Sequence, residues 1–166
     1  MSQQATVIAG FPGIGKSYFT DHNVAKSSSL RVYNFLDLDS NPFSHTHGIP
    51  NPSFPLNYIA HIRNDLLQIP DLVILVGVHD VVRDQMVANG INFTLVYPEQ
   101  GLKGEYMKRW IERGSPGGLV RKLDSMWDVF TGSCANQNAC RHVILQEGVF
   151  LADVMEGILR DEGKRR

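Results

Sequence analysis

The chain has 166 residues, of which 43% are hydrophobic, and this predicts one globular domain spanning residues 1–166. Sixteen Lys and Arg against seventeen Asp and Glu give a formal net charge of −1, which excludes a global attraction to nucleic acid or anionic membranes. No apolar run is long enough to span a bilayer, and the N-terminus lacks a secretory signal pattern, so we expect a cytoplasmic protein. Cys134 and Cys140 fit no zinc pattern, and we expect free thiols.

The first predicted element is a buried strand over residues 6–9 that leads into a phosphate-binding loop of the pattern G-x-x-x-x-G-K-S. Its glycines let backbone N–H groups approach a phosphate closely, Lys16 brings a positive charge to the β- and γ-phosphates, and the Ser17 hydroxyl suits Mg²⁺. The alternative is a glycine turn that precedes Lys-Ser by chance. The predicted nucleotide-binding residues are Gly10, Phe11, Pro12, Gly13, Ile14, Gly15, Lys16, Ser17 and Tyr18.

A pair of acidic residues follows the second predicted strand. After a helix over residues 17–26, residues 31–36 are predicted to form this strand, and Asp37 and Asp39 come directly after it. Ligands of open α/β sheets bind at this carboxyl edge. Residues i and i+2 of an extended segment point the same way, so one carboxylate suits a water of the Mg²⁺ shell and the other an attacking hydroxyl. The alternative is an acidic turn that caps the strand.

The next segment is rich in proline. Pro42, Pro50, Pro52 and Pro55 predict that residues 40–55 have no regular structure, and a helix is predicted over residues 56–68. Tyr58 lies on this helix, where it would either pack in the core or stack against an acceptor molecule. His45 and His47 resemble a metal pair, but no third ligand stands beside them, so a flexible acceptor loop is favoured.

The near-continuous apolar run over residues 71–78 is typical of a strand covered on both faces of a parallel sheet. His79 follows this strand and is a candidate contact for a phosphate or the acceptor, with a polar strand end as the alternative. Arg83 is a candidate for an acceptor phosphate, with an ordinary surface arginine as the alternative. A helix over residues 81–89 and a strand over residues 91–97 come next.

The last part of the chain predicts helices over residues 102–113, 119–130 and 150–160 and a strand over residues 142–145. Arg109 and Arg113 lie four residues apart, so they share one helix face from which they could close over a triphosphate; the alternative is a solvated helix with Glu105 pairs. The alternation of strands and helices predicts a three-layer α/β/α fold with about five parallel strands and helices on both faces.

The phosphate loop followed by Asp-x-Asp resembles the P-loop small-molecule and nucleotide kinases, including shikimate and gluconate kinases. A wider resemblance is to small kinase-like proteins of bacteriophages and prophages, which are described as nucleotide kinases. It rests on Gly10–Ser17, Asp37-Leu-Asp-Ser40, Phe54-Pro-Leu-Asn-Tyr58-Ile-Ala-His61-Ile, Val78-His79 with Val82-Arg83, Phe93-Thr-Leu-Val-Tyr-Pro98, and residues 103–114.

These resemblances imply roles for particular residues. Asp37 would hold the magnesium side of the site and Asp39 the acceptor hydroxyl, while residues 40–70 would bind the acceptor. Residues 99–118 would form a small helical lid whose Arg109 and Arg113 stabilise charge on the transferred phosphoryl group. A phage origin would place the protein in the host cytoplasm.

The sequence therefore predicts a kinase that uses ATP and Mg²⁺, with a nucleoside monophosphate as the first expected acceptor. Asp-x-Asp itself favours an alcohol, because a phosphate acceptor gains little from a nearby base. The second hypothesis is thus a kinase of a hydroxyl on a nucleoside or on hydroxymethylated DNA, although the near-neutral charge counts against long DNA. A P-loop NTPase or nucleotide-dependent switch is the third. The oligomeric state and the choice between ATP and GTP stay open.

Overall fold

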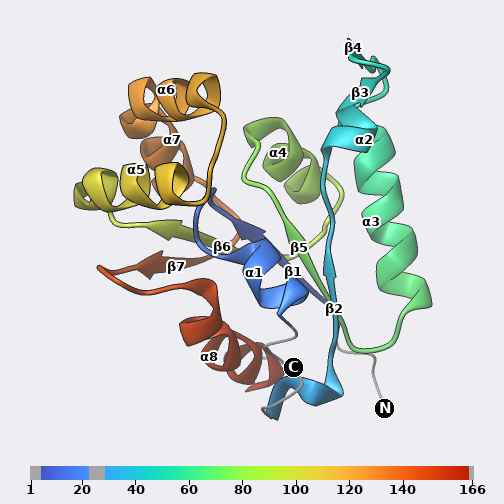
Figure 1. The fold of residues 1–166 in the computed structure, drawn as a ribbon. Coiled ribbons are helices and arrows are strands. Elements are labelled where there is room, and N and C mark those ends of the chain that lie inside the picture. Colours follow the sequence, from blue (N-terminus) through green and yellow to red (C-terminus); the bar gives the residue numbers. More distant parts are fainter. Residues whose placement is uncertain (1–4, 23–28, 165–166) are drawn as a thin grey trace.

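A computed structural model describes residues 5–22 and 29–164 of the chain. Its main sheet has five parallel strands in the order β2-β5-β1-β6-β7 (Figure 1). The strands are β1 (Thr6–Gly10), β2 (Asn34–Asp37), β5 (Leu72–Val76), β6 (Phe93–Pro98) and β7 (Arg141–Leu145). Every residue of β1, β5 and β6 is buried, as expected for central strands with helices on both faces.

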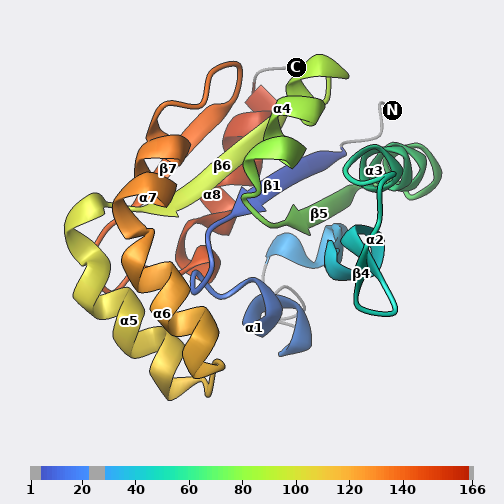
Figure 2. The ribbon, with the colours of Figure 1, turned by 90° about the horizontal axis from the view of Figure 1, so that it is seen from above.

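The helices lie on both sides of this sheet, which confirms the predicted three-layer α/β/α fold (Figures 1 and 2). The right-handed connection from β1 to β2 places α1 (Lys16–Asp21) on one face, and α8 (Leu151–Lys164), which follows the last strand, contacts α1 on the same face. The opposite face carries α3 (Leu56–Gln68), α4 (Asp80–Ala88) and α7 (Trp127–Ala135). None of the helices within the described residues is long and apolar enough to cross a membrane.

Two groups of short elements lie near the carboxyl ends of the strands, with α1 between them in the view from above (Figure 2). One group contains the 3₁₀ helix η3 (Gln100–Leu102), α5 (Lys103–Glu112) and α6 (Gly117–Ser125). The other contains α2 (Asn41–Ser44) and a small antiparallel hairpin of β3 (His45–Thr46) and β4 (Ile49–Pro50). Residues far apart in the sequence thus face each other across the phosphate loop.

The structure corrects two predictions in the first half of the chain. Strand β2 begins at Asn34, because the 3₁₀ helix η2 (Ser29–Val32) takes up the start of the predicted strand. Residues 40–55 contain α2 and a hairpin, although four prolines argued against regular structure. Pro42 is accommodated because it stands in the first turn of α2, where a missing N–H breaks no helical bond. The predicted end of the first helix at Lys26 lies outside the described residues.

The predicted helix over residues 119–130 is also corrected. Two helices, α6 and α7, meet at Met126, and α7 continues to Ala135. The break lets Trp127 turn into the core, where it is 2% exposed and its indole N–H donates to the Gln100 carbonyl at 2.8 Å. Because burying a tryptophan with its N–H satisfied is worth more than one uninterrupted helical turn, tertiary packing overrides the local pattern here.

Candidate active site

The phosphate loop connects β1 to α1 as predicted, and its glycines are required by close contacts. Gly13 has φ +92°, and a Cβ atom there would lie 2.8 Å from the indole nitrogen of Trp110. A Cβ atom at Gly10 would lie 2.9 Å from Cδ of Lys16. A side chain at Gly13 would therefore be strained and would displace Trp110 of α5, whereas one at Gly10 would require the flexible side chains of Ile14, 2.6 Å away, and Lys16 to move.

Lys16 lies inside the loop with its ammonium group against backbone carbonyls. Its Nζ donates to the carbonyl of Gly10 at 2.6 Å and to that of Phe11 at 3.3 Å. Burial lowers the pKa of Lys16 to about 8; the carboxylate of Asp37 opposes this shift, and the positive charge of Arg113 adds to it. The lysine is thus electrostatically coupled to both a predicted metal-side acid and a predicted lid arginine.

This shift predicts a pH dependence of stability that belongs to Lys16. The ordinary pKa is 10.5 and the folded value is about 8, so the unfolded chain binds more protons between these values. The free energy of unfolding of the wild type should therefore rise, relative to that of Lys16→Met, as the pH increases from about 8 to about 10.5. Urea titrations of both proteins across this range measure the difference. A constant difference would show that burial does not perturb the lysine.

Ser17 and Asp37 form the contact expected of a magnesium site. The Ser17 hydroxyl donates to Oδ2 of Asp37 at 2.9 Å, although the two residues are twenty positions apart. Asp37 ends β2, whose register beside β5 brings it level with Leu75 at the carboxyl edge of the sheet. One hydroxyl and one carboxylate beside a phosphate loop fit Mg²⁺, which usually takes few protein ligands and completes its shell with water and substrate phosphates.

Asp39 lies two residues further on and is exposed. Its Oδ1 accepts the backbone N–H of Asn41 at 3.0 Å, which forms the turn that begins α2. Within residues 5–22 and 29–164, no hydrogen bond to Oδ2 of Asp39 is found. The acidic turn considered as an alternative is therefore present, but it occupies one carboxylate oxygen and leaves the other available to a ligand.

Tyr58 holds the segment between the two aspartates in place. Its ring is fully buried, and its hydroxyl donates to the carbonyl of Leu38 at 2.6 Å. Leu38 also donates its N–H to Leu75 of the sheet at 2.9 Å, so both polar backbone groups between Asp37 and Asp39 are fixed. Burial raises the pKa of Tyr58. The structure places Tyr58 behind the acidic pair, and not on the surface that would contact an acceptor.

Replacing Tyr58 by Phe tests this contact through stability. The change keeps the ring and leaves the buried Leu38 carbonyl without its donor, so the free energy of unfolding should fall by about 1–3 kcal/mol. Chemical denaturation provides the measurement. Tyr18→Phe is the matched control, because Tyr18 is 58% exposed and should give a change near zero. Equal stabilities of the two variants would contradict the assigned role.

His79 and Arg83, the two site residues predicted after β5, have different surroundings in the structure. His79 is exposed at the strand end, with its ring edge-to-face against Phe54 at 6.5 Å between centroids. Desolvation lowers its pKa, and the charges that act on it are, in order of size, those of Asp80, Lys122, Lys16 and Asp39. Arg83 is 2% exposed, and its guanidinium donates to groups of Val78, Ser133 and Gln137. This corrects the prediction for Arg83, because these bonds direct it toward α7 and away from the cleft.

Arg109 and Arg113, the two arginines of the predicted lid, also differ in their contacts. The side chain of Arg109 is 10% exposed, donates to the carbonyls of Gly13 at 3.0 Å and Val149 at 3.2 Å, and lies between the rings of Tyr106 and Phe150. Arg113 is exposed, donates to the Ser115 hydroxyl at 2.7 Å, and affects the pKa of Lys16. Arg113 thus lies near enough to Lys16 to affect its pKa, whereas Arg109 holds the outer arch of the phosphate loop, residues 12–14, through the Gly13 carbonyl.

Sequence reasoning missed the other residues that hold this arch. These residues come from segments that are distant in the sequence, and no local sequence pattern predicts such contacts. Two hydrogen bonds reach the loop itself, from Trp110 Nε1 to the Pro12 carbonyl at 3.1 Å and from the Leu151 N–H to the Ile14 carbonyl at 2.8 Å. A third, from the Gly148 N–H to Glu105 Oε1 at 2.7 Å, links the segment before α8 to α5.

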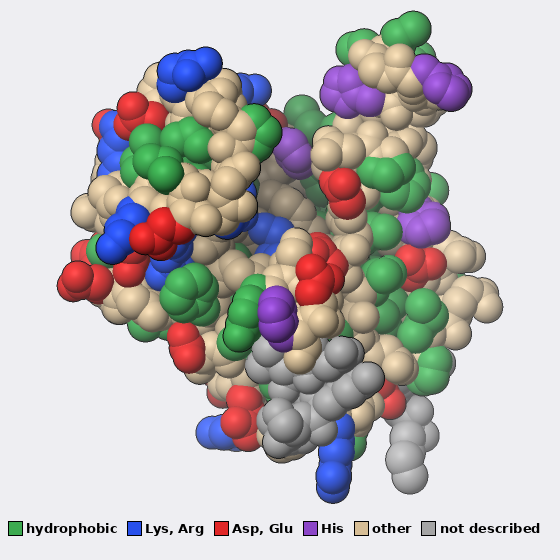
Figure 3. Space-filling view, in the orientation of Figure 1, with side chains coloured by type: hydrophobic (Ala, Val, Ile, Leu, Met, Phe, Trp, Pro, Cys, Tyr) green, Lys and Arg blue, Asp and Glu red, His purple; other side chains and the backbone are tan. Residues whose placement is uncertain are grey.

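Figure 3 shows a hollow in the surface between the two groups of short elements, that of α5 and α6 and that of α2 with the hairpin. Basic, acidic and histidine side chains all reach the surface in this region of the space-filling view. His45 and His47 are exposed on the hairpin, and the described ranges contain no cluster of three or more His, Cys, Asp or Glu able to hold a metal. Cys134 and Cys140 are free thiols.

No family model and no curated protein sequence matches the chain. Among solved structures, it is similar to a gluconokinase from Sinorhizobium meliloti 1021, with a TM-score of 0.59 and 14% identity over 98% of this chain and 93% of that one. An uncharacterized protein from Eubacterium ventriosum ATCC 27560 has a TM-score of 0.47 and 15% identity, over 99% of this chain and 100% of that one. Neither comparison supports a phage or prophage origin. The first shows that this chain shares its fold with a gluconokinase.

Proposed function

We propose that the protein is a Mg²⁺-dependent kinase that transfers the γ-phosphoryl group of ATP to a nucleotide-type acceptor. The observation that carries this proposal is the 2.9 Å contact between Ser17 and Asp37 beside a complete phosphate loop, with Asp39 two residues further on. A phosphate-binding loop alone suits any NTPase, whereas a second exposed carboxylate next to the metal side suits a bound hydroxyl or phosphate acceptor.

Each residue has a defined task in this proposal. The loop amides and Lys16 bind the phosphates, and Ser17 and Asp37 would hold Mg²⁺, which when bound neutralises charge on the β- and γ-phosphates. Asp39 orients the acceptor and accepts its proton, while Arg113 stabilises charge on the transferred phosphoryl group. We further propose that residues 40–70 bind the acceptor and that residues 99–118 act as the lid.

The metal side of the site is tested by Asp37→Asn. The amide keeps the shape of the side chain but loses its charge, so we expect about 10–100-fold weaker binding of Mg²⁺ in the presence of ATP. Titration of activity with MgCl₂ at saturating ATP measures this. Asp84→Asn, at an exposed position of α4, is a control that should leave the titration unchanged. An unaltered Mg²⁺ requirement in Asp37→Asn would contradict the assignment.

Two acceptor classes remain candidates. The resemblance to nucleotide kinases favours a nucleoside monophosphate. The structure adds support for an alcohol, because Asp39 keeps a free carboxylate oxygen while Arg83, the predicted ligand of an acceptor phosphate, is turned into the protein. A hydroxyl of a nucleoside or of hydroxymethylated DNA is therefore the second candidate, and the name of the structural neighbour adds gluconate as a third compound class for testing.

A panel of acceptors separates these possibilities. Labelled γ-phosphate of ATP would be followed, with Mg²⁺, into nucleoside monophosphates, nucleosides, gluconate, and plain or hydroxymethylated DNA. Label in one class identifies the acceptor. Free phosphate that is independent of every acceptor would overturn the kinase proposal in favour of an NTPase.

A further inference from the structure

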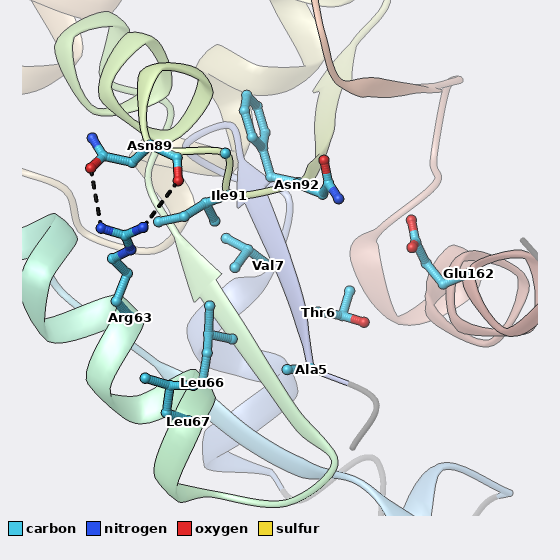
Figure 4. A pocket seen from close by; sticks show the side chains of 12 residues that line it. Ala5, Thr6, Val7, Arg63, Leu66, Leu67, Asn89, Ile91, Asn92 and Glu162 are labelled. Atoms are coloured by element: carbon cyan, nitrogen blue, oxygen red, sulfur yellow. Dashed lines mark hydrogen bonds between the residues drawn. The ribbon is translucent and has the colours of Figure 1, made fainter. Parts of the chain in front are cut away.

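A second cavity lies at the amino ends of the strands, on the sheet edge opposite to the phosphate loop (Figure 4). It has a volume of about 580 Å³, within the range of small-molecule sites. Its walls come from four separate segments: the start of β1, the second half of α3, the turn between α4 and β6, and the end of α8. The cavity is thus a product of the fold and is distinct from the proposed catalytic cleft.

The middle of the cavity is apolar. Val7 and Ile91 are buried and form its floor, and Leu66 and Leu67 of α3 stand at its side (Figure 4). Leu67 is 74% exposed, which is unusual for a leucine beside a ready-made hollow. A flat apolar body placed here would cover this leucine and remove apolar surface from water.

A cationic group stands at one side of the opening. Arg63 donates to Oδ1 and to the carbonyl of Asn89 at 3.4 and 3.3 Å, both long for such bonds. Asn89 is itself held by a 2.8 Å hydrogen bond from its Nδ2 to the Gln85 carbonyl. The guanidinium is therefore positioned at the cavity but weakly engaged, and its remaining N–H groups suit an anion with two oxygens.

The other side offers oxygen atoms. Thr6 is 5% exposed, and its hydroxyl has no hydrogen-bond partner among the residues that the structure describes. Glu162 lies across the opening from Arg63, and its Oε1 accepts the hydroxyl of Thr94 at 3.2 Å (Figure 4). The Thr6 hydroxyl is buried beneath the cavity wall, so the acceptor that the cavity offers on this side is Glu162, whose Oε2 accepts no hydrogen bond among the described residues.

We propose that this cavity binds a small molecule with a carboxylate at one end, a hydrogen-bond donor at the other and a flat apolar body between them. The carboxylate pairs with Arg63, the donor meets Glu162, and the body covers Leu66 and Leu67. The site does not depend on the proposed kinase activity, because none of its residues belongs to the catalytic cleft.

Indole-3-propionate is the probe, since it carries a carboxylate, an indole ring and one ring N–H. Protein-observed NMR with ¹⁵N-labelled full-length chain should show saturable shifts of the Gly90 and Asn92 amides that persist when ATP and Mg²⁺ are present. The affinity should fall about tenfold in Arg63→Gln, and also for the uncharged indole-3-propionamide. Arg160→Gln is the matched control, because Arg160 is an exposed arginine of α8 outside the cavity.

The donor end is tested separately with Glu162→Gln, which keeps the side-chain shape and removes the negative charge. This variant should weaken the binding of indole-3-propionate several-fold more than it weakens the binding of 1-methylindole-3-propionate, which lacks the donor. Saturable shifts at Gly90 and Asn92 that are lost in Arg63→Gln support the proposal. It is overturned if the amides of residues 89–93 do not shift with any of the carboxylates, or if Arg63→Gln binds them as well as Arg160→Gln does.

Discussion

Asp39→Asn is expected to lower the turnover number for phosphoryl transfer by about 10²–10⁴-fold while the affinity for ATP stays unchanged. The physical reason is that the substitution removes the charge that we propose accepts the proton of the acceptor, but keeps a side-chain oxygen for the N–H of Asn41. The turn that begins α2 should therefore survive, and the loss should belong to the chemistry and not to the fold.

The measurement is steady-state transfer with the best acceptor of the panel, together with calorimetric titration of ATP. Asp84→Asn provides the matched control, because Asp84 is an exposed acid on α4, away from the cleft, and its removal should leave transfer unchanged. Transfer by Asp39→Asn within a factor of about two of the wild type would remove Asp39 from the catalytic machinery.

Arg113→Ala is expected to lower the turnover number by about 10²–10³-fold, the usual effect of losing one group that stabilises developing charge. Arg113 is exposed, and its positive charge helps to lower the pKa of Lys16, so it lies near the predicted phosphate site. Because we propose that Arg113 acts mainly in the transition state, the affinity for ATP should change little.

Arg109→Ala is the comparison that makes this prediction specific. Arg109 donates to the carbonyls of Gly13 and Val149, so its loss should destabilise the fold by about 1–3 kcal/mol and weaken ATP binding through the loop. Turnover and ATP affinity of both variants, measured beside urea titrations, separate the two roles. If Arg109→Ala loses turnover at unchanged stability and Arg113→Ala does not, the two assignments are reversed.

The parts of the site that were predictable from sequence depend on short local patterns. The phosphate loop is specified within eight consecutive residues, and parallel strands place their carboxyl ends at one edge, so the proximity of Asp37 to Ser17 could be inferred before the structure. The fold class was equally accessible, because buried parallel strands read as continuous apolar runs such as residues 72–76.

The remaining features depend on contacts between distant segments. Nothing in the sequence near Arg83 indicates that Ser133 and Gln137 of a later helix would surround its guanidinium. The helix pattern around Tyr58 fits core packing and ligand contact equally, and only the position of the Leu38 carbonyl distinguishes them. Arginine and tyrosine each have an apolar stem and a polar end, so they serve either purpose, and tertiary structure decides which.

The central claim is that this cleft transfers phosphate to an acceptor and does not merely hydrolyse ATP. Its most direct test is one reaction of the wild-type protein with γ-labelled ATP, Mg²⁺ and the acceptor panel, in which labelled acceptor and free phosphate are counted together. We predict that most of the label released from ATP appears on one acceptor class and that free phosphate stays near background. Free phosphate released at the same rate with and without every acceptor, with no labelled acceptor, would contradict the account.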